Sequence, residues 1–343
     1  MAAPAGLSAT LLRHWAQPRL TLLTTALWPV GQAMRLLVAL RRQLYHRGVL
    51  ASWRAPVPVL VVGNLILGGA GKTPTVLTLV PALRALGWTP GVVSRGHGRA
   101  RACVVVARDG SSAAELGDEP ALLHRRLQVP LAVGADRVAA AQALLKAHPE
   151  VDVLLSDDGL QHLRLQRDAA LVLFDARGAG NGQCLPAGPL REPLPRQLDA
   201  HAQVLYTHGT ATTHLPGHLG GRHLAGALPL RDWWSGAAPQ PLSSLREGRW
   251  TAAAGIAQPE GFFAMLRAAG LDIQPLELPD HARLDALPWR GTTGDVVVTE
   301  KDAIKLNPAR PGCEAVWVAI LKSDLPPALI DALDHQLRQS RPS

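Results

Sequence analysis

The chain has 343 residues, which fits two domains better than one, and its 47% of hydrophobic residues excludes a largely disordered protein. A formal net charge of +8 favours anionic partners such as phosphates, acidic lipids or nucleic acid, but no aromatic cluster is interleaved with a basic run, which disfavours binding of single-stranded nucleic acid. The three cysteines lack metal-ligand spacing and indicate a reducing compartment without a zinc site.

The first fifty residues differ from the rest of the chain. Residues 20–30 are apolar, but Pro29, Gly31, Gln32 and Arg35 interrupt any longer run, so we do not expect a transmembrane helix. No small-residue cleavage site follows at a suitable distance, so we do not expect a cleavable signal peptide either. Residues 33–47 have helical spacing, with an apolar side and arginines opposite. Together with Trp15 and Trp28, this pattern is typical of a helix lying in a membrane interface. A helical pair packed on the protein's own core and a single membrane span are the alternatives.

A glycine-rich loop follows the first expected strand, at 57–62, and ends in Gly71-Lys72-Thr73, which opens a helix. This order suits a phosphate-binding loop, in which backbone N–H groups and the lysine bind phosphates and the threonine hydroxyl binds Mg²⁺. The standard pattern has glycine where Ile66 stands, and an ordinary strand–turn–helix is the alternative. The nucleotide-binding residues predicted from the loop are Gly68, Gly69, Ala70, Gly71, Lys72, Thr73 and Pro74.

Short apolar runs then alternate with helical patterns. Strands are expected at 91–94, 103–107, 129–133, 151–155, 169–174 and 202–206, and helices at 73–87, 118–127 and 135–147. Nearly continuous apolar strands are typical of a parallel sheet that is buried on both faces.

The pattern weakens between 210 and 248, which is the best place for a domain boundary. A second α/β set follows, with strands at 250–254, 273–278, 296–299 and 315–320 and helices at 259–269 and 326–338. We therefore expect a membrane-associating helical segment at 1–50, a P-loop α/β domain at 51–215 and a smaller α/β domain at 216–343. The smaller domain is expected to close the cleft between itself and the P-loop domain.

Two aspartates, Asp157 and Asp158, come directly after the apolar strand at 151–155. P-loop enzymes place a Mg²⁺ ligand at such a strand end, where ligands of parallel sheets gather. The next residue is glycine, so a plain turn is the alternative. Gln161 and His162 follow on the same turn and favour a metal or phosphate shell.

Four further motifs each allow a chemical and a plain interpretation. Asp118 either caps a helix or takes a proton from a substrate hydroxyl, and the cap is favoured by pattern alone. Arg95 either binds phosphate or lies in a solvated loop. His281, preceded by an aspartate, either forms a carboxylate–imidazole pair or is a surface histidine. Lys301 and Asp302, after a strand, either contact a nucleotide base or belong to a helix cap.

Eight motifs occur in one order: GNLILGGAGKTP, SRGHGR, GDEP, SDDGLQH, GPLRE, GIAQPEGFF, LPDH and TEKDAIK. Over residues 36–305 this set resembles the tetraacyldisaccharide 4′-kinase family, the lipid A 4′-kinases of Gram-negative bacteria. The family's loop also lacks the first glycine, so Ile66 agrees with the resemblance. His97 stands where the family often has tyrosine.

The resemblance implies an ATP- and Mg²⁺-dependent kinase that phosphorylates the 4′-hydroxyl of a tetraacylated glucosamine disaccharide 1-phosphate to give lipid IVA. It implies a P-loop kinase-like α/β/α sandwich, a second and smaller α/β domain, and an amphipathic N-terminal helix. The enzyme would sit peripherally, as a monotopic protein, on the cytoplasmic face of the inner membrane, in contact with the membrane surface. No nucleic acid and no obligate protein partner are inferred.

The resemblance also assigns roles to residues. The expected catalytic residues are Asp118, His281 and Lys72. Those expected to bind the metal are Thr73, Asp157, Glu192 and Gln161. Those expected to contact the substrate or to support the site are Arg95, Asp158, His162, Glu119 and Arg137. Lys301 and Asp302 are added to the expected nucleotide-binding residues. With the resemblance, the catalytic interpretation of Asp118 overtakes the cap.

Two other classes of function remain open from the residues alone. A P-loop GTPase or ATPase switch would use Lys72 and Asp157, but it gives no role to Asp118, His281 or the N-terminal helix. A nucleic-acid-dependent ATPase is indicated by the charge only.

Overall fold

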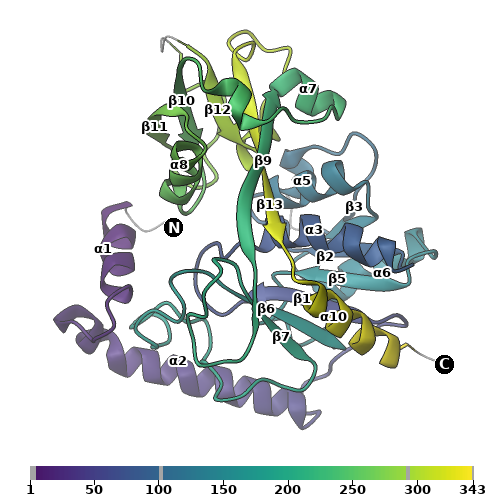
Figure 1. Ribbon diagram of the computed structural model, residues 1–343. Coiled ribbons are helices and arrows are strands. Elements are labelled where there is room, and N and C mark those ends of the chain that lie inside the picture. The colour runs from purple at the N-terminus through teal and green to yellow at the C-terminus, as the bar shows by residue number, and fades with distance from the viewer. Residues whose placement is uncertain (1–4, 100–102, 291–293, 342–343) are drawn as a thin grey trace.

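The computed structural model describes residues 5–99, 103–290 and 294–341, so residues 1–4 of the expected N-terminal segment and residues 291–293 and 342–343 of the expected smaller domain lie outside the described residues. Within them the chain is an α/β protein with two separate sheets and a pair of N-terminal helices (Figure 1).

The larger sheet contains the phosphate-loop strand at its centre. Its strands are β1 (Val59–Asn64), β2 (Pro90–Ser94), β3 (Val105–Val106), β4 (Leu131–Val133), β5 (Val153–Asp157), β6 (Ala169–Phe174), β7 (Ala202–Tyr206) and β8 (His218–Leu219). Their order is β3-β4-β2-β5-β1-β6-β7-β8, and all neighbours are parallel except β3 and β4. Each of the strands predicted between 91 and 206 has its counterpart here.

Alternate residues of β1 enter two different cores, because successive side chains of a strand point to opposite faces. Leu60 and Val62 pack in one core, and Val59 and Val61 pack in the other. The helices that cover the two faces are α3 (Lys72–Ala85), α4 (Ala113–Leu116), α5 (Asp118–Leu127), α6 (Arg137–Ala147) and α10 (Pro327–Gln339). Leucines of α3, α5 and α10 lie in the first core and those of α6 in the second, so the predicted α/β/α sandwich is confirmed.

The smaller sheet has five strands in the order β11-β10-β12-β13-β9. They are β9 (Gly221–Pro229), β10 (Arg249–Ala254), β11 (Asp272–Glu277), β12 (Val296–Thr299) and β13 (Val316–Asp324). Between them lie α7 (Leu230–Ser235), a 3₁₀ turn η1 (Leu242–Leu245), α8 (Pro259–Ala268) and α9 (Glu300–Ala303). Strand β9 pairs antiparallel with β13, and both are long and extend toward the larger sheet (Figure 1).

Strand β9 lies inside 210–248, where the sequence pattern predicts no element. The first half of β9, at 221–225, carries polar residues and is only partly buried, and Gly226 interrupts the strand. The alternation of polar and apolar residues that marks a half-buried strand is therefore absent. The last helix, α10, returns to the larger sheet and packs against α3. The division of the chain at 215 and 216 stays a prediction.

The N-terminal helices are α1 (Ala5–Trp15) and α2 (Leu22–His46). The helix predicted at 33–47 begins too late, because α2 starts at Leu22 and continues through Pro29. A proline costs a helix one backbone hydrogen bond, which a helix of this length can lose. Gly31 is buried where α2 crosses the loop at 184–187, since a Cβ there would lie 3.0 Å from Cys184 O.

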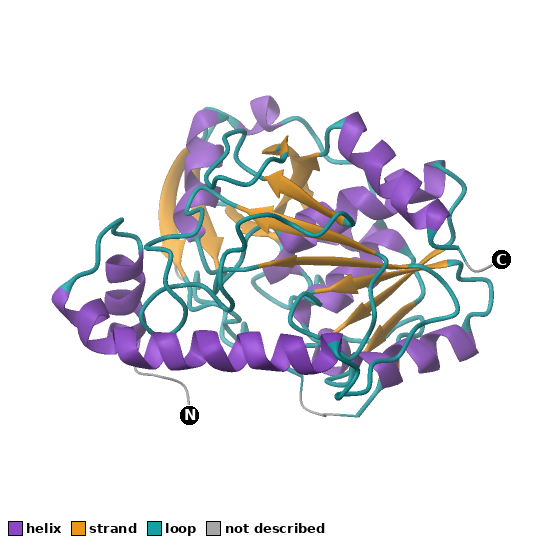
Figure 2. Ribbon diagram, turned by 90° about the horizontal axis from the view of Figure 1, so that it is seen from below, coloured by secondary structure: helices purple, strands orange, loops and turns teal. Residues whose placement is uncertain are grey.

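Helix α2 runs along one edge of the molecule with most of its surface exposed (Figure 2). By length and composition it is the one helix among the described residues that could cross a membrane. Its exposed apolar side chains include Leu22 at 92%, Leu36 at 70% and Leu37 at 64% exposure. These figures disfavour the alternative in which the segment packs on the protein's own core.

Candidate active site

The loop between β1 and α3 has the backbone form of an anion-binding turn. Gly68 and Gly71 adopt φ values of 93° and 85°, in the left-handed region that favours glycine. Gly71 is the N-cap residue of α3 and supplies no side chain to its first turn. In the described part of the chain, no acceptor receives a hydrogen bond from the backbone N–H groups of residues 68–71. Free N–H groups at a helix N-terminus are what a phosphate requires.

Lys72 begins α3 and is only 9% exposed. Its Nζ donates to Asn64 Oδ1 at 3.0 Å and lies 3.5 Å from Asp158 Oδ1. The ammonium group is therefore held over the loop by one amide and one carboxylate. A bound phosphate would offer it a stronger, charged acceptor in the same place.

A cavity of about 1240 Å³ opens between the phosphate loop and the smaller sheet. The expected site residues that line it are Gly68, Gly69, Gly71, Lys72, Thr73, Pro74, Arg95, Glu119, Asp157, Asp158, Gln161, His281 and Lys301. Those that do not line it are Ala70, Asp118, Arg137, His162, Glu192 and Asp302. Three residues of α2, Met34, Val38 and Arg41, line the same cavity. The cavity thus joins the N-terminal helix to the nucleotide loop.

Asp157 ends β5 and is buried beside the loop. Its Oδ2 accepts from Ser94 Oγ at 3.3 Å, while Oδ1 has no partner among the described residues. Burial, followed by the charge of Glu119, raises the pKa of Asp157 to about 7. A buried carboxylate oxygen without a donor fits a site for a cation or its bound water.

Asp158 has a different environment although it is the next residue. Its backbone has a φ of 52°, and its Oδ1 lies 3.5 Å from Lys72 Nζ and accepts from Arg191 Nη1 at 2.9 Å. Burial alone would raise the pKa of Asp158, but Lys72 and Arg191 outweigh it and hold the pKa below its usual value. Asp158 therefore stays charged and orders the lysine.

Gln161 and Glu192 contact each other at the rim of this region. Gln161 Nε2 donates to Glu192 Oε1 at 3.1 Å, and Arg42 of α2 lies 3.5 Å from the same carboxylate. Glu192 does not line the cavity, so its place in a metal shell stays a prediction. The contact with Arg42 ties α2 to the segment between β6 and β7, to which Glu192 belongs.

Arg137 and His162 contact each other, and neither lines the cavity. Their expected role at the substrate stays a prediction. The backbone N–H of Arg137 donates to His162 Nε2 at 3.3 Å, and its Nη1 donates to Gly134 O at 2.7 Å. Burial lowers the pKa of Arg137 to about 10. Burial and the charge of Arg137 lower the pKa of His162 to about 4, so this imidazole is neutral at physiological pH.

Asp118 is the first residue of α5, and Gly117, not Asp118, is the N-cap residue. The cap interpretation is therefore wrong, and the carboxylate is available for another partner. His281 Nδ1 lies 3.1 Å from Asp118 Oδ2, across the gap between the two sheets. Burial alone would raise the pKa of Asp118, but the hydrogen bond from His281 and the charges of Lys305 and Lys301 hold it below its usual value. The Asp118–His281 pair is thus formed in this structure.

Lys301 lies beside this pair and not over the loop. Its Nζ is 3.1 Å from Asp280 Oδ1, 3.2 Å from Glu119 Oε1 and 3.4 Å from His281 Nε2. Burial alone would lower the pKa of Lys301, but Glu119 and Asp280 outweigh it and raise the pKa. Because Glu119 belongs to α5, the ammonium group links the two sheets. Its role as a nucleotide contact stays a prediction.

Asp302 is fully buried in α9, which follows β12 of the smaller sheet. Its carboxylate accepts from Gly255 N at 3.0 Å and Thr299 Oγ1 at 2.7 Å, and Lys305 lies at 2.9 Å. Thr299 is the N-cap residue of α9, so the cap interpretation of this motif is confirmed. Asp302 has no face toward the cavity and stays a prediction as a nucleotide contact.

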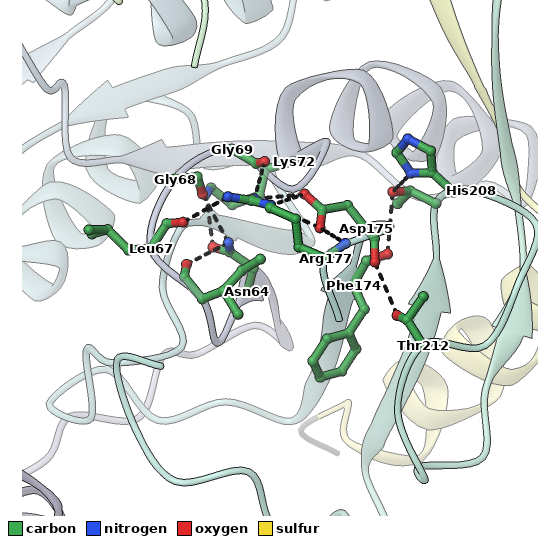
Figure 3. Close-up of polar contacts among 12 residues, drawn as sticks. Asn64, Leu67, Gly68, Gly69, Lys72, Phe174, Asp175, Arg177, His208 and Thr212 are labelled. Carbon is green, nitrogen blue, oxygen red and sulfur yellow. Dashed lines mark hydrogen bonds and ion pairs between the residues drawn. The ribbon is translucent and has the colours of Figure 1, made fainter. Parts of the chain in front are cut away.

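Several polar residues of the site are absent from the sequence prediction. Arg177 contacts the phosphate loop (Figure 3), and Arg222 lines the cavity and donates to His208 at 2.9 Å. Asn64 and Arg191 stand inside the motifs GNLILGGAGKTP and GPLRE, so a signal for them existed. Arg222 belongs to β9, which the pattern misses, and Arg177 follows β6 in a loop whose contacts are long-range.

The fold and site define a class of protein. A parallel sheet whose central strand leads through a glycine loop to Lys72 and Thr73, with Asp157 ending the neighbouring strand, is a P-loop nucleotide-binding protein. The Asp118–His281 pair beside the same cavity adds a group that can take up a proton.

Comparison with known proteins narrows this class. The family model described as tetraacyldisaccharide-1-P 4′-kinase matches residues 23–338, and the chain belongs to this family. Tetraacyldisaccharide 4′-kinases of Leptothrix cholodnii and Methylibium petroleiphilum are each 51% identical to it; the alignments cover 98% of this chain in both cases and 98% and 96% of those proteins. A crystal structure of LpxK from Aquifex aeolicus in complex with ATP is 26% identical, with a TM-score of 0.76, and covers 92% of this chain and 100% of that one.

Proposed function

We propose that the protein transfers the γ-phosphate of ATP to the 4′-hydroxyl of a tetraacyldisaccharide 1-phosphate and gives lipid IVA. The observation that carries the proposal is the Asp118–His281 pair, which lies beside the cavity that contains the phosphate loop. A nucleotide switch needs the loop but has no use for a proton acceptor held in this way. The pair therefore favours transfer to a hydroxyl acceptor.

Phosphoryl transfer depends on positioning and charge neutralisation more than on covalent chemistry. The free N–H groups of residues 68–71 and the ammonium group of Lys72 bind the phosphates of ATP. Asp158 and Asn64 keep that ammonium group at the loop before ATP arrives. The binding site for the donor is therefore preorganised.

Asp157 and Thr73 would hold the Mg²⁺ that accompanies ATP. The unpartnered Oδ1 of Asp157 fits this role, and both residues line the cavity. No group of three or more His, Cys, Asp or Glu side chains suited to a metal occurs among the described residues. That agrees with Mg²⁺, which takes one or two carboxylates together with substrate phosphates and water. When bound, the ion would neutralise charge that develops on the phosphates.

Asp118 takes the proton from the 4′-hydroxyl as the phosphate is transferred. The lowered pKa of Asp118 keeps it ionised at neutral pH, so it is ready to accept. An ionised carboxylate accepts only, so His281 donates through Nδ1 and positions it. Because His281 follows β11 of the smaller sheet, the site is complete only when the two sheets approach.

We infer that the enzyme works at the cytoplasmic face of the inner membrane as a peripheral, monotopic protein. A substrate with four acyl chains stays in a bilayer, and α2 carries exposed leucines next to side chains that line the cavity. Deleting residues 1–32, which removes α1 and the first part of α2, should reduce sedimentation with anionic liposomes. Unchanged sedimentation would contradict the membrane proposal.

The direct test of the activity uses ATP labelled in the γ-phosphate and the tetraacyldisaccharide 1-phosphate as acceptor. We expect label in the lipid product and none with Lys72→Ala. A nucleotide switch or a nucleic-acid-dependent ATPase would release labelled inorganic phosphate and leave the lipid unlabelled. That result would refute the proposed function.

A further inference from the structure

Four consecutive carbonyl groups of the phosphate loop, at residues 66–69, accept hydrogen bonds from two side chains of the described residues, Asn64 and Arg177. Asn64 takes the first and the third. Its Nδ2 donates to Ile66 O at 2.8 Å and to Gly68 O at 3.0 Å. Asn64 is fully buried and stands at the end of β1, so its position is fixed by the sheet.

Arg177 takes the second and the fourth carbonyl (Figure 3). Its Nη1 donates to Leu67 O at 3.2 Å and its Nη2 to Gly69 O at 2.8 Å. The guanidinium group reaches the loop from the segment after β6, more than a hundred residues along the chain, at a sequence separation of 110 from Leu67. Carbonyls at alternate positions are therefore held by two different parts of the larger sheet.

The guanidinium group of Arg177 is itself held on its other edge. Asp175, which is buried directly after β6, accepts from Nε at 3.0 Å and from Nη2 at 2.6 Å (Figure 3). The side-chain amide of Gln258, just before α8, also faces the guanidinium group, and with its oxygen turned toward Arg177 it accepts from Nε at 2.7 Å. A planar guanidinium fork suits such simultaneous contacts, and a lysine ammonium group does not reproduce them.

These contacts have a consequence for the N–H groups of the loop. In a trans peptide the N–H points opposite to the preceding C=O, so holding Leu67 O and Gly69 O fixes the N–H directions of Gly68 and Ala70. Those N–H groups have no acceptor in the described part of the chain. Glycines have more backbone freedom than other residues, and a carbonyl turned toward the phosphates would repel them.

We propose that Arg177 is a positioning residue for ATP, which acts through the loop carbonyls and not by contact with the nucleotide. Asp175 fixes the guanidinium group, Arg177 fixes alternate carbonyls, and the freed N–H groups receive the phosphates. The inference rests on the proposed function in taking ATP as the ligand. It adds Arg177 to the residues on which the ATP-binding site depends.

The test measures Mg²⁺-ATP binding by calorimetry on the full chain, together with the KM for each substrate. Arg177→Gln should weaken ATP binding and raise the KM for ATP about ten- to a hundredfold, the range for losing hydrogen bonds from a charged group. The KM for the lipid should stay at its wild-type value. The melting temperature without nucleotide should fall, because Arg177→Gln leaves the buried carboxylate of Asp175 without its cation. Arg177→Lys should recover little, because it restores the charge without the fork.

Arg84→Gln is the matched control. Arg84 also holds two carbonyls with one guanidinium group, Leu127 O at 2.7 Å and Gln128 O at 3.1 Å, but at the far end of α3. We expect this variant to bind ATP as the wild type does. A loss of ATP affinity equal to that of Arg177→Gln would overturn the proposal, since any two-carbonyl contact would then have the same effect.

Unchanged ATP affinity in a folded Arg177→Gln protein overturns the inference. If that variant does not fold, Asp175→Asn decides, because it keeps the side-chain volume and removes the charge that holds the guanidinium group. Weaker ATP binding by Asp175→Asn supports the inference, and wild-type binding overturns it. A wild-type protein that binds no ATP would instead overturn the proposed function itself.

Discussion

Removing the imidazole of His281 should shift the pH range in which the enzyme works. Its Nδ1 lies 3.1 Å from Asp118 Oδ2, and the two side chains are 30% and 17% exposed, so the hydrogen bond is partly shielded from water. A hydrogen bond to a charged group contributes about 1.5–3 kcal/mol. Loss of this hydrogen bond therefore raises the pKa of Asp118.

The sign follows from the causes of the shift. In the wild type the pKa of Asp118 is lowered because His281, Lys305 and Lys301 outweigh burial. Without His281 the burial stays, so the pKa of Asp118 rises and the carboxylate is protonated at higher pH. The acid limb of kcat plotted against pH should therefore move to higher pH in His281→Ala.

A double-mutant cycle on kcat completes this test. His281→Ala should lower kcat about ten- to a hundredfold, and Asp118→Ala about a hundred- to ten-thousandfold, while ATP still binds. Because the histidine acts through the carboxylate, the double variant should be no slower than Asp118→Ala alone.

His148→Ala is the control, since His148 makes a similar contact, 3.0 Å to Glu150, on the surface outside the cavity. The reasoning would be refuted if the acid limb of His281→Ala did not move. It would also be refuted if the fold losses in kcat of the two single variants multiplied in the double variant. Single-turnover phosphorylation at the wild-type rate would do the same for either residue.

Two further predictions concern the metal and the backbone at Asp118. Asp157→Asn should raise the Mg²⁺ concentration needed for half-maximal activity at least about tenfold, and a Mg²⁺ titration at fixed ATP with the wild-type midpoint would contradict its place at the ion. Gly117→Ala should lower the free energy of unfolding in urea by about 1–3 kcal/mol, because Gly117 has a φ of 88° and a Cβ there would lie 2.7 Å from His97 O. A variant as stable as the wild type would show that the backbone relaxes at little cost.

Local features of the site could be predicted from the sequence because they depend on neighbouring residues. The glycine loop, Lys72 and Thr73 follow one another directly after an apolar strand, and Asp157 follows another. Strand order then brings them together, since β1 and β5 are adjacent and parallel. The carboxyl ends of parallel strands meet at one edge of a sheet, so this part of the site needs no knowledge of distant contacts.

The remaining features depend on contacts between distant parts of the chain. Asp118 and His281 are 163 residues apart, and only the resemblance to a family joined them before the structure did. Local pattern favoured a cap at Asp118, because an aspartate before an apolar helix usually caps it. Arg177 carries no local signal, since its partners are loop carbonyls that any sequence would provide. The part of α2 before residue 33 was not predicted, because a pattern that contains Pro29 does not show that a long helix tolerates the lost hydrogen bond.

The antiparallel pair β9 and β13 has a mechanical consequence. The chain enters the smaller sheet through β9 and leaves it through β13, which is followed by α10 on the larger sheet. Two hydrogen-bonded strands form a ribbon, which bends across its plane more readily than it twists or stretches. Eight residue pairs, from Trp317–Pro229 to Asp324–Gly221, hold this ribbon together, with an irregularity between Ile320 and Leu321. Because the chain passes between the two sheets only through this ribbon in both directions, we expect any change in its bend to change the distance between His281 and Asp118.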